Sequence, residues 1–224
     1  LSGCPMRRLG GILWGCALLC AACTSETYDT GDGSYSYIRA DFVMAHTAGA
    51  AEIDRVVTDE EATLALAPHA TAQWASQADT LYRALLYYDY HEGAQQVRPR
   101  SLSQVLVLRP MQTTRRDTLK RDPMVFESAW MSKDGKFLNV GFAVKTGQDG
   151  DGQLHKQRLG LLCDTIREDG AVSALHFRIT HDQCGVPEYY SSRGFLSIPI
   201  NDTARKAAIR LQLTTYDGEV TKDF

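Results

Sequence analysis

The sequence has no surplus of positive charge. It holds 24 lysines and arginines against 27 acidic residues, which gives 224 residues a net charge of −3. Proteins that bind nucleic acid regardless of sequence neutralise phosphates with an excess of lysine and arginine. We therefore expect no nucleic-acid partner.

Motifs that bind cofactors or carry out familiar chemistry are also missing. No P-loop, dinucleotide fingerprint or G-x-S-x-G elbow occurs, and the six histidines are scattered without paired metal-ligand spacing. His181, Asp182 and Cys184 are the one cluster that combines possible ligands, but a structural zinc site requires four. We expect no cofactor, no metal and no catalytic residues. An envelope hydrolase that uses the His181, Asp182 and Cys184 loop is the alternative.

Long apolar runs are lacking too. Arg7 and Arg8 precede the nearly uncharged run "LGGILWGCALLCAA" at positions 9–22. A membrane-spanning helix needs about 20 apolar residues, and this run is shorter and broken by glycines. A basic start, a short apolar stretch and small residues at its end are the layout of a secretory signal. The pattern predicts that residues 1–22 are a signal peptide.

Cysteine is concentrated at this signal. Residues 19–23, "LCAAC", resemble a bacterial lipobox, in which small residues precede a cysteine that receives the lipid. Cys23 fits best because Ala21 and Ala22 precede it, although Cys20 stands where an aliphatic residue is usual. We expect lipidation, with palmitate among the acyl chains, at Cys23. This predicts a membrane-held protein of the cell envelope, on the outer membrane and facing the periplasm or the surface. The alternative is cleavage elsewhere, with the cysteines serving as small apolar residues.

Two cysteines lie in the body of the chain. The segments 158–166 and 171–181 flank the turn "REDG" and predict a hairpin, in which Cys163 lies opposite a residue near His176. Cys184 then lies beyond the end of that pairing, farther away than a disulfide allows. We expect both thiols to be free; a strand that folds back after the hairpin is the alternative that would let them pair. Cys163 shares a strand face with Leu159 and Leu161, which indicates a buried position.

The first half of the mature chain is predicted to form a tether followed by strands. Residues 23–37 are polar and lack periodicity, which is typical of a flexible tether. About five strands follow between residues 37 and 110, and segment 68–80 could hold a short helix. This predicts an OB-like five-stranded β-barrel over residues 38–115. The charged segment 111–124 is interpreted as the linker to a second domain.

The second half shows clean alternation of apolar and polar residues. Leu138, Val140 and Phe142 share one face of their segment, and Ile209 and Leu211 share a face of another. About seven such segments are separated by turns such as "SKDGK", "REDGA" and "YDGE". Short half-buried strands at this spacing predict an antiparallel β-sandwich over residues 122–224. The whole chain is thus expected to be all-β.

Four segments together resemble a known family. They are "YRALLYYDY" (82–90), "FESAWMSKDGKFLNVGFAVKTG" (126–147), "LHFRITHDQCGVPEYYSSRGFLSIPI" (175–200) and "LTTYDGEVTKDF" (213–224), and they are similar to the NigD-like lipoproteins of the Bacteroides group. The resemblance implies an N-terminal OB-type domain, a C-terminal β-sandwich and, from the family's bacteriocin-associated gene cluster, an accessory or immunity-like role. It implies no catalytic residues. We expect a binding or interaction module whose ligand is a protein or a glycan, since aromatic side chains could supply stacking platforms.

Overall fold

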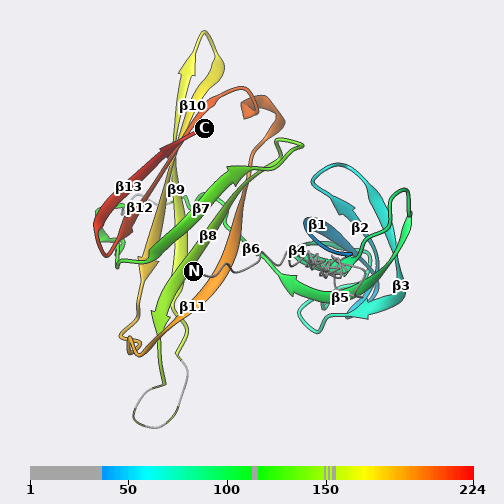
Figure 1. The fold of residues 1–224 in the computed structure, drawn as a ribbon. Coiled ribbons are helices and arrows are strands. Elements are labelled where there is room, and N and C mark those ends of the chain that lie inside the picture. Colours follow the sequence, from blue (N-terminus) through cyan, green and yellow to red (C-terminus); the bar gives the residue numbers. More distant parts are fainter. Residues whose placement is uncertain (1–36, 113–115, 149, 151, 153–154) are drawn as a thin grey trace, which may run out of the picture. The chain divides into compact units, whose positions relative to one another are not determined.

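The computed structural model describes residues 37–112, 116–148, 150, 152 and 155–224, and residues 37–224 belong to one compact unit. Figure 1 shows that strands make up nearly all of its regular structure, which confirms the all-β prediction. Two short 3-10 turns, η1 (Arg116–Thr118) and η2 (Asp202–Ala204), interrupt the strands. The described residues include no helix long and apolar enough to cross a membrane.

The first five strands close into a barrel, as predicted, in the order β1-β2-β3-β5-β4. Alternating residues of each strand point inward, so that Val43, Ala45, Ile53 and Val56 are completely buried. Closure pairs the edge strands with each other, which leaves no open sheet edge. The strands are β1 (Ile38–Gly49), β2 (Glu52–Thr58), β3 (Thr63–Thr71), β4 (Leu81–Asp89) and β5 (Gln96–Gln104).

The helix considered for residues 68–80 is wrong. β3 continues to Thr71, and the segment after it forms turns whose residues Ala72 and Ala75 are buried in the barrel core. The turn between β1 and β2 fixes this path, because the N–H of Ala72 donates to the Ala51 carbonyl and the N–H of Ala51 donates to the Ala75 carbonyl, both at 2.8 Å. Hydrogen bonds to a neighbouring turn thus replace those that a helix would make within itself.

The remaining strands form two four-stranded sheets, which confirms the β-sandwich. One sheet has the order β13-β12-β10-β9 and the other β6-β11-β8-β7. The strands are β6 (Leu106–Val107), β7 (Val125–Met131), β8 (Phe137–Thr146), β9 (Arg158–Glu168), β10 (Ala171–Asp182), β11 (Tyr190–Pro199), β12 (Ala208–Thr215) and β13 (Gly218–Asp223).

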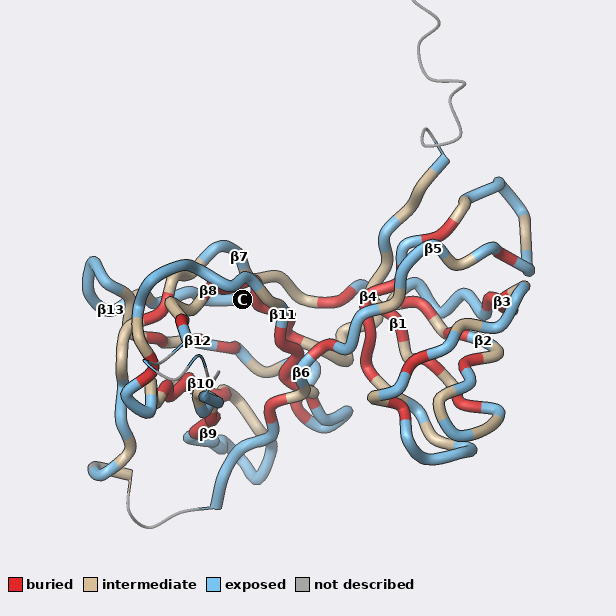
Figure 2. Tube along the Cα trace, turned by 90° about the horizontal axis from the view of Figure 1, so that it is seen from below, coloured by how far each residue is buried: buried red, intermediate tan, exposed pale blue. Residues whose placement is uncertain are grey.

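The sandwich is not antiparallel throughout. β12 pairs with β10, and β6 with β11, in parallel. The parallel pairing of β10 with β12 follows from the topology. After β10 the chain crosses to β11 in the other sheet and then crosses back, so that β12 runs in the same direction as β10. The core between the sheets is built by inward-facing residues that include Leu138, Val140, Leu196, Ile198 and Leu211, each with none of its surface exposed. Figure 2 shows the buried residues of these strands in red.

The predicted hairpin of β9 and β10 is present. Asp169 and Gly170 form its turn with φ angles of 50° and 81°, the left-handed values that a tight hairpin requires. Cys163 lies opposite Phe177, next to His176, as predicted. The pairing is irregular between Val172 and Ala174, where one strand carries an extra residue.

The chain leaves the barrel earlier than the charged segment 111–124. β5 ends at Gln104, although the five strands were expected to extend to residue 110, and Leu106 and Val107 already pair with β11 of the sandwich. The charged segment is itself bonded to the sandwich, since the N–H of Asp122 donates to the His181 carbonyl at 2.9 Å. That residues 38–115 and 122–224 are separate domains stays a prediction, and the pairing of β6 with β11 leads us to expect that the second domain needs residues from about 105 onward.

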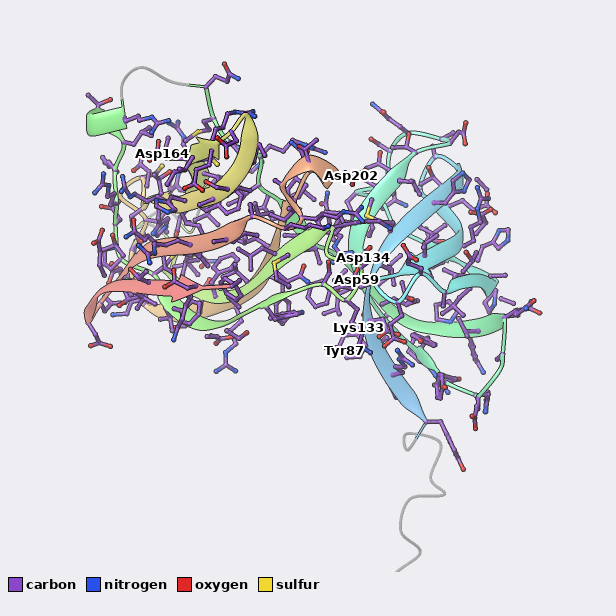
Figure 3. All side chains as sticks on the ribbon, turned by 90° about the horizontal axis from the view of Figure 1, so that it is seen from above. Asp59, Tyr87, Lys133, Asp134, Asp164 and Asp202 are labelled. Carbon is purple, nitrogen blue, oxygen red and sulfur yellow. The ribbon has the colours of Figure 1, made fainter. Side chains whose placement is uncertain are left out.

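A buried arginine joins side chains of both β-structures. The guanidinium of Arg83, on β4, has no exposed surface and makes a two-pronged ion pair with Asp59 at 2.5 and 2.7 Å. It also donates to Asn139 Oδ1 on β8 at 3.1 Å and to Ser197 Oγ on β11 at 3.2 Å, and it lies 4.1 Å from the ring centre of Phe137. Figure 3 labels Asp59. We assign this network a structural role because the Arg83 guanidinium is engaged by Asp59, Asn139 and Ser197 of the same chain.

Candidate ligand cavity

His181, the base of the alternative hydrolase, is a structural residue. It lies near the end of β10 and is 2% exposed. Its Nε2 is 2.7 Å from Gln157 Oε1, and its Nδ1 is 3.2 Å from the carbonyl oxygens of Asp122 and Pro123. The amide nitrogen of Gln157 donates to the Lys145 carbonyl at 2.7 Å, which orients its oxygen toward the imidazole. Both ring nitrogens therefore contact groups that hold the ends of the strands in place.

Asp182 and Cys184 form a turn of their own. Asp182 Oδ1 accepts the N–H of Cys184 at 2.9 Å and lies 3.2 Å from Lys120 Nζ. The Cys184 N–H first, and then Lys120, hold the pKa of the Asp182 carboxyl below its usual range. Cys184 is exposed and has a φ of 53°. In the described part of the chain, no hydrogen bond joins His181 to Cys184, so the three residues are neighbours in sequence but not one site.

No cluster of three or more histidine, cysteine or acidic side chains in metal-binding proximity occurs among the residues that the structure describes. Cys23, the expected lipidation site, and the expected signal and tether up to residue 36 lie outside the described residues.

These positions lead to different expectations for two substitutions. His181→Ala should lower the free energy of unfolding by about 1–3 kcal/mol, because it leaves buried hydrogen-bonding groups without partners. Cys184→Ser should change it by less than about 0.5 kcal/mol, because the side chain is exposed. Thermal or urea unfolding of the two variants measures both. Equal losses of stability would contradict the role assigned to His181.

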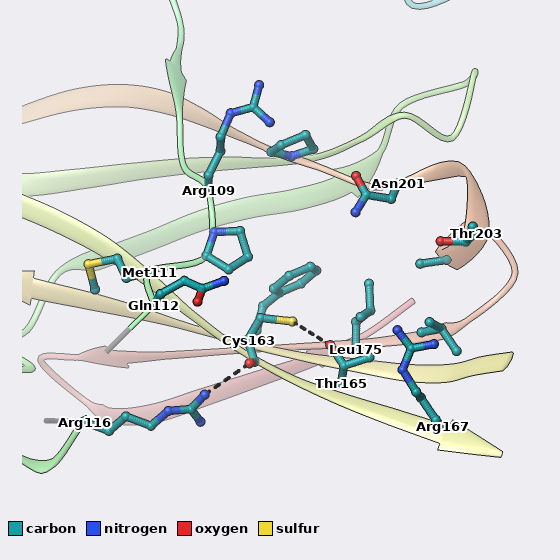
Figure 4. A pocket seen from close by; sticks show the side chains of 15 residues that line it. Arg109, Met111, Gln112, Arg116, Cys163, Thr165, Arg167, Leu175, Asn201 and Thr203 are labelled. Atoms are coloured by element: carbon teal, nitrogen blue, oxygen red, sulfur yellow. Dashed lines mark hydrogen bonds between the residues drawn. The ribbon is translucent and has the colours of Figure 1, made fainter. Parts of the chain in front are cut away.

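A cavity of about 1020 Å³ lies against the sandwich. Its lining comes from β9 and β10, from the segment that follows β6, and from the end of β11 with η2. Figure 4 shows Cys163 and Leu175 between the side chains of Arg116 and Arg167, with Arg109 on the irregular segment that follows β6. The volume is just above the range typical of small-molecule sites, about 300–1,000 Å³.

The charges of this cavity have one sign. The described lining residues include Arg109, Arg116 and Arg167 and no acidic side chain. Arg116 forms an ion pair with Asp164, which is not among the described lining residues, and donates to the Cys163 carbonyl at 3.4 Å. Arginine in such a setting offers a planar set of donors that matches carboxylate or phosphate oxygens. The cavity is therefore suited to an anion.

Cys163 is the one thiol of this cavity. Burial first of all raises the pKa of its thiol, so the protonated form prevails at neutral pH. Its Sγ is 3.8 Å from the Thr165 hydroxyl, and the described lining contains no histidine that could serve as a base. Both Cys163 and Cys184 are free, as their spacing predicts. The arrangement favours binding over thiol catalysis.

Sequence reasoning missed this cavity. Its arginines come from three segments, and Arg109 and Arg116 stand in or beside the charged stretch that was interpreted as a solvated linker. Only the fold brings them to Arg167. The aromatic side chains differ in how far they are available for stacking: Tyr82 packs against Trp74 with ring centres 5.8 Å apart, whereas Tyr189 is 77% exposed.

Comparisons with known proteins identify the family. The model of the NigD-like C-terminal β-sandwich domain matches residues 107–224, more than half of the chain. No curated protein matches. A NigD-like immunity protein from Bacteroides caccae is 21% identical, with 83% of this chain and 91% of that one covered and a TM-score of 0.62.

Two further solved structures have the same fold. A candidate toxin-related protein from Parabacteroides distasonis is 15% identical over 84% of this chain and 92% of its own, with a TM-score of 0.61. A candidate lipoprotein from Bacteroides fragilis is 11% identical over 84% of this chain and 96% of its own, with a TM-score of 0.54. With the sandwich domain matched from β6 to the C-terminus, the chain belongs to the NigD-like family.

Proposed function

We propose that this protein is a lipid-anchored, non-catalytic binding module of the bacterial cell envelope. The observation that carries the proposal is the cavity of the sandwich, where Arg109, Arg116 and Arg167 surround apolar side chains without a nucleophile and base in contact. Convergent polar groups over an apolar surface are typical of ligand sites. The proposed role is to hold a ligand, not to convert it.

The anchor is supported by the sequence before the barrel. A signal-like segment ends in Ala21, Ala22 and Cys23, and a polar stretch separates Cys23 from β1. The structural neighbour from Bacteroides fragilis is a candidate lipoprotein, which supports the proposed lipid anchor. Membrane attachment through a lipid would leave the barrel and the sandwich free to meet a partner or ligand.

An accessory or immunity-like role is supported by the other neighbours. One is a NigD-like immunity protein and another is a candidate toxin-related protein. Proteins of this kind act by binding, which suits a chain whose candidate residues His181, Asp182 and Cys184 are occupied with structural contacts. The partner is expected to be a protein or glycan, or a smaller ligand held in the cavity.

Metabolic labelling tests the anchor. Labelled palmitate supplied to cells should enter the wild-type chain and be lost completely in Cys23→Ser, because a thioether-linked lipid needs that sulfur. Cys16→Ser is the matched control, since it changes a thiol of the same signal outside the lipobox-like residues 19–23 and should keep the label. Equal incorporation into wild type and Cys23→Ser would refute the assignment of the anchor.

A further inference from the structure

We propose that the cavity lined by Arg109, Arg116 and Arg167 binds a small amphipathic acid, a carboxylate attached to an apolar body. The inference rests on the proposed function, because it names the chemistry of the ligand that such a binding module would hold. It depends on three features of the cavity: an apolar floor, unequal engagement of the arginines, and a polar rim.

The apolar floor is supplied by β10. Leu175 and Phe177 are buried in the sandwich core and border the cavity, and Val172 beside them is half-buried. Val172, with the small part of Leu175 and Phe177 that borders the cavity, offers a ligand an apolar surface that water solvates poorly. A bare inorganic anion would leave this surface uncovered. A ligand with an apolar chain or ring would cover it, so the floor favours an amphipathic molecule.

The arginines differ in how far the protein already uses them. Arg116 is paired with Asp164. Arg167 donates only to the Gly170 carbonyl, at 3.4 Å, and Arg109 has no hydrogen bond or ion pair among the described residues. Two guanidinium groups thus retain most of their donors for a ligand. Because guanidinium and carboxylate form two parallel hydrogen bonds, a carboxylate is well suited to engage them.

The rim adds polar groups without negative charge. Asn201 and Thr203 are exposed and line the cavity beside η2, and the Asn201 side chain makes no capping hydrogen bond to that turn. They could contact a ligand while leaving the positive charge of the arginines uncompensated. The shared chemistry, a carboxylate on an apolar group, could come from a free acid or from the C-terminal residue of a peptide.

Isothermal titration of the mature chain with decanoate tests the inference, with decanamide as a probe of equal shape and no charge. Wild type should bind decanoate more than about tenfold more tightly than decanamide. Arg109→Gln and Arg167→Gln should each weaken decanoate binding about tenfold, the usual effect of losing a charge-assisted hydrogen bond. An N-acetylated leucine tripeptide, with a free or an amidated C-terminus, shows whether a peptide carboxylate binds more tightly than the free acid.

Two further variants complete the design. Asn201→Asp places a negative charge in the cavity with almost no change in shape, and it should weaken decanoate about tenfold while leaving decanamide unchanged. Arg98→Gln, an exposed arginine of β5, is the matched control and should bind like wild type. Three results would overturn the inference: equal affinity for decanoate and decanamide, no binding of decanoate or of the tripeptide acid, or a loss of decanoate affinity in Arg98→Gln as large as that in the cavity variants. Palmitate labelling of Cys23 is independent of these results, so a failed ligand assignment leaves the anchor intact.

Discussion

Replacing Asp59 by alanine should lower the free energy of unfolding by about 3–5 kcal/mol, the usual effect of removing one partner of a buried ion pair. Asp59 gives both carboxylate oxygens to Arg83, whose side chain is completely buried, while its own side chain is 16% exposed. Without that carboxylate the guanidinium keeps only neutral acceptors, Asn139 and Ser197. A charge would then remain buried without its counter-charge.

Two comparisons make this test specific. Glu52→Ala removes an acid whose pair with His69 is exposed, at 54% and 51%, and should cost less than about 1 kcal/mol. Asp59→Ala combined with Arg83→Met should be more stable than Asp59→Ala alone, because methionine removes the unpaired charge and keeps much of the apolar volume. Urea unfolding measures all three. An effect of Asp59→Ala as small as that of Glu52→Ala would show that the buried network is not formed.

The second large effect concerns the start of the sandwich. A fragment of residues 105–224 should unfold cooperatively by itself, whereas residues 122–224 should not, because the shorter piece lacks β6 and Leu108. Leu108 is 7% exposed and belongs to the sandwich core, and its N–H donates to the Ser197 carbonyl at 3.0 Å. Loss of a buried leucine alone usually costs about 2–5 kcal/mol, comparable to much of a domain's stability.

Circular dichroism during thermal unfolding distinguishes the two fragments. The expected outcome is a sharp transition for residues 105–224 and a broad one, or aggregation, for residues 122–224. If neither fragment unfolds cooperatively, the barrel is needed to complete the sandwich core, and the prediction of two separate domains is wrong. If both do, segment 105–121 contributes little to the sandwich.

Local patterns predicted the fold well because alternation reports burial directly. In β8, Leu138 and Val140 lie on the face that the sequence assigns to the core, and in β12 Ile209 and Leu211 do the same. The predictions that were wrong depend on contacts between distant segments. The path of residues 72–75 is fixed by hydrogen bonds with Ala51, which donates one and accepts the other, and the parallel pairing of β10 with β12 follows from a strand in the other sheet.

The candidate site shows the same limit more sharply. The sequence predicts a possible site at His181, Asp182 and Cys184 because these residues are close together in the chain. In the structure they contact different partners. Arg109 and Arg167 carry no local motif, and 57 positions separate them along the chain (167 − 109 − 1). Only the packing of the segment after β6 beside β9 brings their guanidinium groups to one cavity. A charged residue near a turn gives no sign in the sequence of whether it faces solvent or a ligand.

Native mass spectrometry of the mature chain, isolated from cell envelopes and supplied with decanoate, tests the binding role most directly. We expect wild type to retain one acid molecule per chain, and the double variant Arg109→Gln with Arg167→Gln to appear without it. Identical spectra of the two proteins, both bare or both loaded, would contradict the account, because the cavity and its arginines would then not be the site that holds the ligand.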